Sequence, residues 1–203
     1  MPVNLQKGQK VELKKSSGGA LRRVIVGLGW DEATPQKVSG LLGTLFGVQK
    51  THAIDCDASA FACVDGKIIS NRDIVYFGNL IHQSKAIQHM GDNLTGEGNG
   101  DDEQIIVNLE SLPSAYDKVV FVVNIYQAKE RNQHFGMIQN AFIRVCDADT
   151  NQELCRYNLS ENYQNMTAMV FGEIYRHNGQ WKFNAIGQAT SDNDIKALAR
   201  RFS

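Results

Sequence analysis

The chain has 203 residues, of which 42% are hydrophobic and 21% are charged, and these values are ordinary for a globular protein with a sizeable core. The 21 basic and 22 acidic side chains leave a formal net charge of −1. Because no basic stretch with interleaved aromatic residues occurs, we do not expect a nucleic-acid-binding protein. One domain over residues 1–203 is predicted.

Strands are predicted along most of the chain, because segments with period-two alternation or many β-branched residues dominate it. The predicted strands are 10–14, 22–28, 60–69, 73–77, 103–109, 118–126, 141–147, 153–158, 168–177 and 180–189. Between the last two, Asn178-Gly179 can supply the positive φ angles of a type I′ turn. Many short strands separated by Gly, Asn and Asp predict a mainly β fold, an antiparallel β-sandwich.

Helix is scarce in the sequence. The C-terminal stretch SDNDIKALARRF predicts a helix with Ser191 or Asp192 as its N-cap and basic residues in its last turn. A short helical turn is predicted near 135–140. Residues 33–50, rich in Gly and small residues, fit neither period, and we expect them to form an insertion or flap.

The cysteines and the hydropathy indicate the compartment. Cys56, Cys63, Cys146 and Cys155 lack CxxC spacing and have no paired histidines nearby, so we predict reduced thiols buried in strands rather than a zinc site. The N-terminal sequence has no long apolar run, and the longest elsewhere is VVFVV at 119–123. We therefore expect a cytoplasmic protein that does not span a membrane.

The stretch MGDNLTGEGNGDDEQIIVNL, residues 90–109, places five carboxylates and four glycines in front of a strand. No Lys or Arg occurs between Lys85 and Lys118. Because like charges repel, more strongly where water is excluded, these carboxylates must either spread apart or hold a cation. The segment from Asp92 to Glu103 supplies the carboxylate, amide and backbone oxygens that calcium prefers.

The calcium hypothesis has alternatives at each acidic position. The segment is not an EF-hand, because Leu94 and Glu97 occupy positions where that loop needs a ligand and a glycine. In IDCDAS, Asp55 and Asp57 point to one face of an extended chain, but most such pairs are merely solvated. In GLGWD, Asp31 follows a strand, where an aspartate is usually only a turn residue. The acidic loop itself could be hydrated without a metal.

Several longer stretches resemble the TerD family of tellurium-resistance and stress-response proteins. The matching stretches are LQKGQKVEL (5–13), VGLGWD (26–31), IDCDASAFACVDGK (54–67), VYFGNL (75–80), GDNLTGEGNGDDEQIIVNLESLP (91–113), NAFIRVCDADT (140–150) and GQWKFNAIGQ (179–188). The resemblance implies a calcium-binding β-sandwich with two neighbouring Ca²⁺ ions in an acidic cleft. The implied metal ligands are Asp31, Asp55, Asp57, Asp92, Asn93, Asp101, Asp102 and Glu103. Residues 33–50 depart from the family pattern, in which many relatives pass more directly from GWD to the DxDAS strand.

Two functions remain open at this point. The first is a non-enzymatic calcium-binding module with no catalytic residues, which docks in a calcium-dependent way to an anionic ligand, an acidic membrane surface or another stress-response protein. The alternative is a metal-dependent hydrolase acting on phosphate esters. No GxSxG, HExxH or Walker A motif supports an enzyme, and His89 is the best candidate for a general base.

Overall fold

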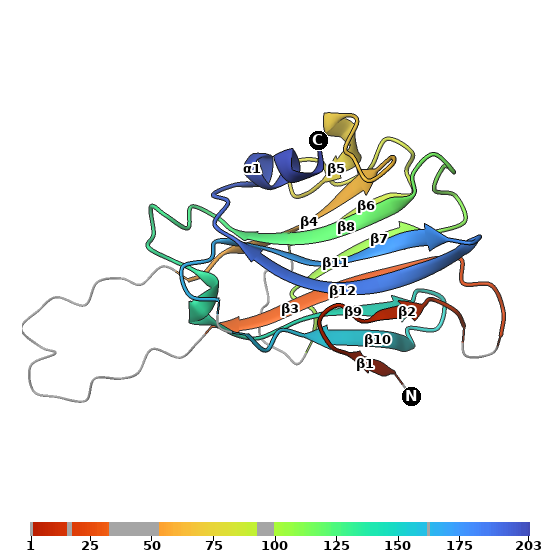
Figure 1. The fold of residues 1–203 in the computed structure, drawn as a ribbon, viewed down its shortest axis with the longest axis horizontal. Helices are drawn as coiled ribbons and strands as arrows, with labels where there is room; N and C mark the ends of the chain where they lie inside the picture. Colours follow the sequence, from red (N-terminus) through yellow and green to blue (C-terminus); the bar gives the residue numbers. More distant parts are fainter. Residues whose placement is uncertain (1, 16–17, 33–52, 93–99, 162) are drawn as a thin grey trace, which may run out of the picture.

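Two six-stranded β-sheets face one another across a shared apolar layer (Figure 1). The structure, a computed structural model, describes residues 2–15, 18–32, 53–92, 100–161 and 163–203. Residues 33–50, predicted as an insertion or flap, lie outside the described residues. All strand pairs are antiparallel except β1 with β10, which are parallel. The mainly β sandwich predicted from the sequence is therefore confirmed.

The first sheet contains the two strands that flank the acidic segment, one ending at Asp92 and the other beginning at Glu103. In spatial order it consists of β1 (Val3–Leu5), β10 (Glu153–Asn158), β9 (Ile138–Asp147), β3 (Arg23–Glu32), β7 (Glu103–Asn108) and β6 (Ile87–Asp92). On β3, Val24, Val26 and Leu28 are buried against the second sheet. The residues between them therefore face outward, since side chains alternate along a strand.

The second sheet is covered on both faces. In spatial order it consists of β2 (Lys10–Glu12), β12 (Gln180–Thr190), β11 (Ala168–His177), β8 (Lys118–Ile125), β4 (Cys56–Cys63) and β5 (Ile74–Val75). The short helix α1 (Ile195–Ala199) and the 3₁₀ turn η3 (Arg200–Phe202) lie on its outer face (Figure 1). Leu198 is fully buried there with Val120 and Val122. This double coverage explains why β8 reads as a continuous apolar run.

The observed elements differ from the predicted ones at identifiable places. Each predicted strand overlaps an observed one, but β1 and β6 were not predicted, and β4 begins at Cys56 rather than at residue 60. The helix N-cap is Asp194, whose side chain accepts the Ala197 N–H, and not Ser191 or Asp192. The turn predicted near 135–140 is the 3₁₀ turn η2 (Phe135–Met137).

Two local predictions are confirmed. Asn178 and Gly179 join β11 to β12 with φ angles of 51° and 76°, as a type I′ turn requires. All four cysteines are free, buried and located in strands. In the part of the chain that the structure describes, no helix is long and apolar enough to cross a membrane.

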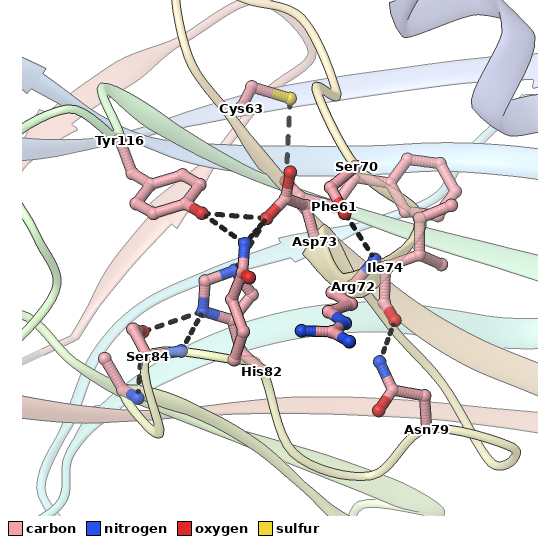
Figure 2. A network of polar contacts seen from close by, with 12 residues as sticks. Phe61, Cys63, Ser70, Arg72, Asp73, Ile74, Asn79, His82, Ser84 and Tyr116 are labelled. Carbon is pink, nitrogen blue, oxygen red and sulfur yellow. Dashed lines mark hydrogen bonds and ion pairs between the residues drawn. The ribbon is translucent and has the colours of Figure 1, made fainter.

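A buried polar network fastens the segment before β6 to the rest of the sandwich (Figure 2). One carboxylate oxygen of Asp73, which ends the 3₁₀ turn η1 (Asn71–Asp73), accepts hydrogen bonds from Tyr116 Oη at 2.8 Å and Gln83 Nε2 at 2.7 Å. His82 Nε2 lies 3.2 Å from the same oxygen. Because His82 Nδ1 accepts the Ser84 N–H, the proton must be on Nε2, and the ring donates to Asp73.

Replacing Tyr116 by Phe should destabilise the protein by about 2 kcal/mol, because a buried carboxylate loses a hydrogen bond. Chemical denaturation of the two proteins measures the difference in the free energy of unfolding. Tyr175→Phe, in β11 and outside the network, is the matched control and should change this free energy by less than about 0.5 kcal/mol. Equal effects of the two substitutions would contradict the role of the network.

Burial also lowers the pKa of His82 below 6.5, against the opposing effect of Asp73. The unfolded chain then binds the proton near pH 6.5, whereas the folded chain binds it only at lower pH. This group's contribution to stability is therefore complete above pH 6.5 and is lost as the pH falls through the window below it. An NMR titration of the His82 ring protons should give a midpoint below 6.5; a midpoint at or above that value would refute the assignment.

Candidate metal centre

Asp101 is held by an arginine on the outer face of the first sheet. Arg144 Nε lies 2.6 Å from one carboxylate oxygen of Asp101 and Nη2 lies 3.0 Å from the other, which also accepts a hydrogen bond from Gln104 at 2.9 Å. The carboxylate lies directly over Gly27, where any Cβ would overlap it. This ion pair raises the pKa of Arg144. Both oxygens of Asp101 are therefore already engaged with protein donors.

A second ion pair continues the same surface. Both Nε and Nη2 of Arg156 donate to Glu153, at 3.1 and 3.0 Å, and the Arg156 guanidinium stacks on the Phe142 ring at 4.1 Å. Arg144 Nη1 also reaches Glu153, at 3.3 Å. The two guanidiniums are thus neutralised by two carboxylates, those of Asp101 and Glu153.

These ion pairs border a cleft of about 540 Å³. Its lining residues are Trp30, Asp31, Gly100, Asp102, Asn140, Phe142, Arg144, Arg156, Asn158 and Leu159. Asp31 accepts a hydrogen bond from the side-chain amide of Asn140 at 2.8 Å, and Asp102 accepts one from the backbone N–H of Trp30 at 2.7 Å. Within the described part of the chain, no Lys or Arg forms an ion pair with either carboxylate.

Asp102 shows the electrostatic consequence of this arrangement. Burial raises the pKa of its carboxyl, and the hydrogen bond from Trp30 only partly opposes that effect. The charges of Asp31 and Asp101 raise the pKa further. The arginines that line the cleft pair with Asp101 and Glu153 rather than with Asp102. A cation in the cleft would give the charged form of Asp102 a direct partner.

Glu103 points away from this cleft and into the space between the sheets. Its carboxylate accepts the backbone N–H of Ala58 on β4. His89 Nε2 lies 3.2 Å from the Ala58 carbonyl oxygen and 3.8 Å from Glu103, while His89 Nδ1 accepts the Gly91 N–H at 3.0 Å. The pairing of β4 with β5 begins only at Ala60. The side chains of Glu103 and His89 thus contact the backbone N–H and carbonyl of Ala58, at a point of β4 that β5 does not pair with.

Asp57 of the DxDAS stretch lies on β4 in the second sheet, and Asp55 lies directly before that strand. Asp57 faces outward from β4, opposite Asn124 on β8, and Asp55 is exposed with Arg131 at 3.8 Å. Between them, the Cys56 thiol points into the core. Burial raises the thiol pKa, and the charges of Asp57, Glu103, Asp55 and Asp102 raise it further. The two acidic groups therefore lie at the same end of the sandwich, although Asp57 does not line the cleft of Asp31 and Asp102.

Two further predicted ligands are not fully described. Asp92 ends β6 and pairs with Glu103 in the sheet, but its side chain and all of Asn93 lie outside the described residues. Among the residues that the structure does describe, no three His, Cys, Asp or Glu side chains form a group that could hold a metal ion. Sequence reasoning did not identify Asn140 or Arg144, because outward-facing polar residues of a strand are usually only solvated.

The whole chain matches one protein family. The family model for the TerD domain matches residues 1–202. The chain belongs to the TerD family. It is 45% identical over 202 residues to the stress response protein SCP2 of Bacillus subtilis (strain 168), with all of both chains covered. It is 43% identical to the tellurium resistance protein TerD of Serratia marcescens, covering 93% of this chain and 91% of that one.

A solved structure supports the fold of this TerD-family chain. The crystal structure of a homologue of telluride resistance protein TerD from Streptomyces coelicolor A3(2) superposes with a TM-score of 0.63 at 21% identity. The superposition covers 91% of this chain and 99% of that one. This likeness supports the fold, whereas the family model and the relatives above confirm the tellurium-resistance and stress-response family expected from sequence resemblance.

The different surroundings of Asp101 and Asp102 predict different effects of mutation in the presence of a chelator. Asp101→Asn should lower the free energy of unfolding by about 2 kcal/mol, because Arg144 loses the carboxylate that accepts two of its hydrogen bonds. Asp102→Asn should cause no comparable loss, since it removes a charge that lacks a cationic partner. Gly27→Ala should displace Asp101. The double variant Gly27→Ala, Asp101→Asn should therefore lose less free energy of unfolding than the sum of the losses in the two single variants. Additive losses would show that Gly27 does not hold this ion pair in place.

Proposed function

We propose that this TerD-family chain is a calcium-binding stress-response module, which acts by calcium-dependent docking to a partner or ligand. The observation that carries the proposal is the pair Asp31 and Asp102, two carboxylates in one cleft without a basic partner among the described residues. A cation there would relieve their repulsion. Oxygen ligands without His or Cys favour Ca²⁺ over Zn²⁺.

The described residues fit the ion in part. Asp31, Asp102, Asn140 and Gly100 line the cleft, and each of these residues has an oxygen atom of the kind that coordinates calcium. Asp92 and Asn93 remain ligands predicted from the sequence. Asp101 and Glu103 already accept hydrogen bonds from protein groups, and we propose that they fix the backbone beside the site.

A second ion at Asp55 and Asp57 rests on the family resemblance. These aspartates lie on β4 and before it, at the same end of the sandwich as the cleft. When bound, calcium would supply positive charge to an acidic surface and order the groups around it. An acidic face could in this way become a surface for an anionic ligand, an acidic membrane or another stress-response protein. The names of the relatives support a role in stress and tellurium resistance.

The hydrolase alternative receives less support from the described residues. His89, its best general base, is only 2% exposed and is engaged with Ala58 and Gly91. None of the described residues that line the cleft is a histidine. A general base must reach the substrate's proton within hydrogen-bond distance, which His89 does not do from its buried position.

Calcium should raise the stability of the protein measurably. At a free concentration 100 times its dissociation constant, Ca²⁺ adds about 2.7 kcal/mol per independent site, so the melting temperature should be higher in calcium than in EGTA. Asp31→Asn and Asp102→Asn should each reduce this shift. Glu110→Gln, on the exposed surface beside Arg22, is the control and should leave it unchanged.

Two outcomes would refute the calcium proposal. One is an equal melting temperature in millimolar calcium and in EGTA. The other is displacement of Ca²⁺ by an equal concentration of Mg²⁺ or Zn²⁺, because we expect a site made of oxygen ligands alone to prefer calcium to both ions.

A further inference from the structure

A second cavity lies on the outer face of the second sheet, away from the cleft of Asp31 and Asp102. It has a volume of about 290 Å³, which is small for a ligand site. Strands β4 and β8 contribute its floor, since Asp57 and Ser59 alternate with the inward-facing Cys56 and Ala58. Asn124 of β8 lies directly opposite Asp57. The cavity is therefore built on two paired central strands.

The floor of this cavity contains a buried hydroxyl group without a partner. Ser59 is only 1% exposed, and its Oγ forms no hydrogen bond with any described residue. Buried polar atoms in native proteins nearly always have a partner, which can be a bound molecule. Asn124, also buried, lines the same cavity beside it. A hydroxyl and an amide oxygen can both accept hydrogen bonds from a ligand.

The charge of the lining selects the sign of that ligand. Asp57, Glu130 and Asp194 all line the cavity, and no Lys, Arg or His does so among the described residues. Glu130 is exposed, on the loop after β8. Asp194 is the N-cap of α1. These three carboxylates lie around the Ser59 hydroxyl and the Asn124 amide, which can accept hydrogen bonds. The cavity therefore favours a cation that can donate hydrogen bonds.

The walls distinguish an organic cation from a metal ion. Phe77 and Tyr126 line the cavity and are 56% and 41% exposed, which is high for aromatic rings. The guanidinium of Arg131 lies 5.1 Å from the centre of the Tyr126 ring, a cation–π contact within the protein. Aromatic rings attract organic cations through cation–π interaction but offer no ligand to calcium.

We propose that this cavity binds a small aliphatic ammonium compound, a mono- or diamine. One ammonium group carries three N–H donors, which Ser59, Asn124 and the carboxylate of Asp57 can accept. The alkyl chain would lie against the rings of Phe77 and Tyr126. The site shares no lining residue with the cleft of Asp31 and Asp102. It does share Asp57 with the second calcium ion proposed above, so the amine and that ion would compete for one carboxylate, and the test is made without calcium.

Isothermal titration calorimetry of the full chain in EGTA tests the proposal with butylammonium and 1,4-diammoniobutane as probes. We expect saturable binding at one site by at least one of them, and none by the uncharged analogue 1-butanol. Ser59→Ala should weaken binding about fivefold, the value of one hydrogen bond near 1 kcal/mol. It should not lower the melting temperature, because the lost hydroxyl has no protein partner.

Charge substitutions complete the test. Glu130→Gln should weaken amine binding severalfold, whereas Glu12→Gln, on β2 at the far edge of the same sheet, should not. Absence of saturable binding by both amines in the millimolar range would overturn the proposal. So would unchanged affinity in Ser59→Ala. If Ca²⁺ displaces the amine and Ser59→Ala weakens calcium binding, the cavity is a metal site instead.

Discussion

The two sheets of this sandwich are joined at their acidic end by a hydrogen bond from the Ala58 backbone to the Glu103 side chain. The positions of the neighbouring strand ends depend on this hydrogen bond. Glu103 is the first residue of β7, so its position fixes where the acidic segment enters the sheet. His89, near the end of β6, accompanies it against the same residue of β4. The chain on both sides of residues 93–99 is therefore anchored to the strand that carries Asp57.

The alternation of side chains along strands then distributes the acidic residues among three environments. Glu103 is buried between the sheets, Asp31 and Asp102 line the cleft on the first sheet, and Asp57 lines the cavity on the second. Asp101 is set apart from these by its ion pair with Arg144. Residues that are adjacent in sequence thus differ in solvation and in partners, and their chemical roles differ for that reason.

The sequence predicts a strand well where buried and exposed residues alternate along it, as in β12, and where a specific turn joins it to the next strand, as Asn178-Gly179 joins β11 to β12. It fails for β6, whose second inward residue is His89. A histidine becomes a core residue here only because Glu103 and Ala58, distant in sequence, accommodate it. The start of β4 was missed for a related reason, since Asp57 and Ser59 face a polar cavity rather than an apolar layer.

The acidic residues of the candidate site were predicted from their density in the sequence, but their partners were not. The observed position of Asp101 requires a glycine at position 27 on β3 and an arginine at position 144 on β9. No local pattern connects these three positions. The sequence therefore indicates where negative charge accumulates, whereas only the packed strands determine which carboxylates are already neutralised.

The burial of the cysteines has a chemical consequence for a protein of a stress-response family. Burial raises the pKa of all four thiols, to about 12 for Cys63 and Cys155. The thiolate is the form that reacts with oxidants and soft metalloid ions, and at pH 7 a thiol of pKa 12 is ionised in only about one molecule in 10⁵. These side chains therefore hold little of the reactive thiolate form and serve as small apolar groups of the core.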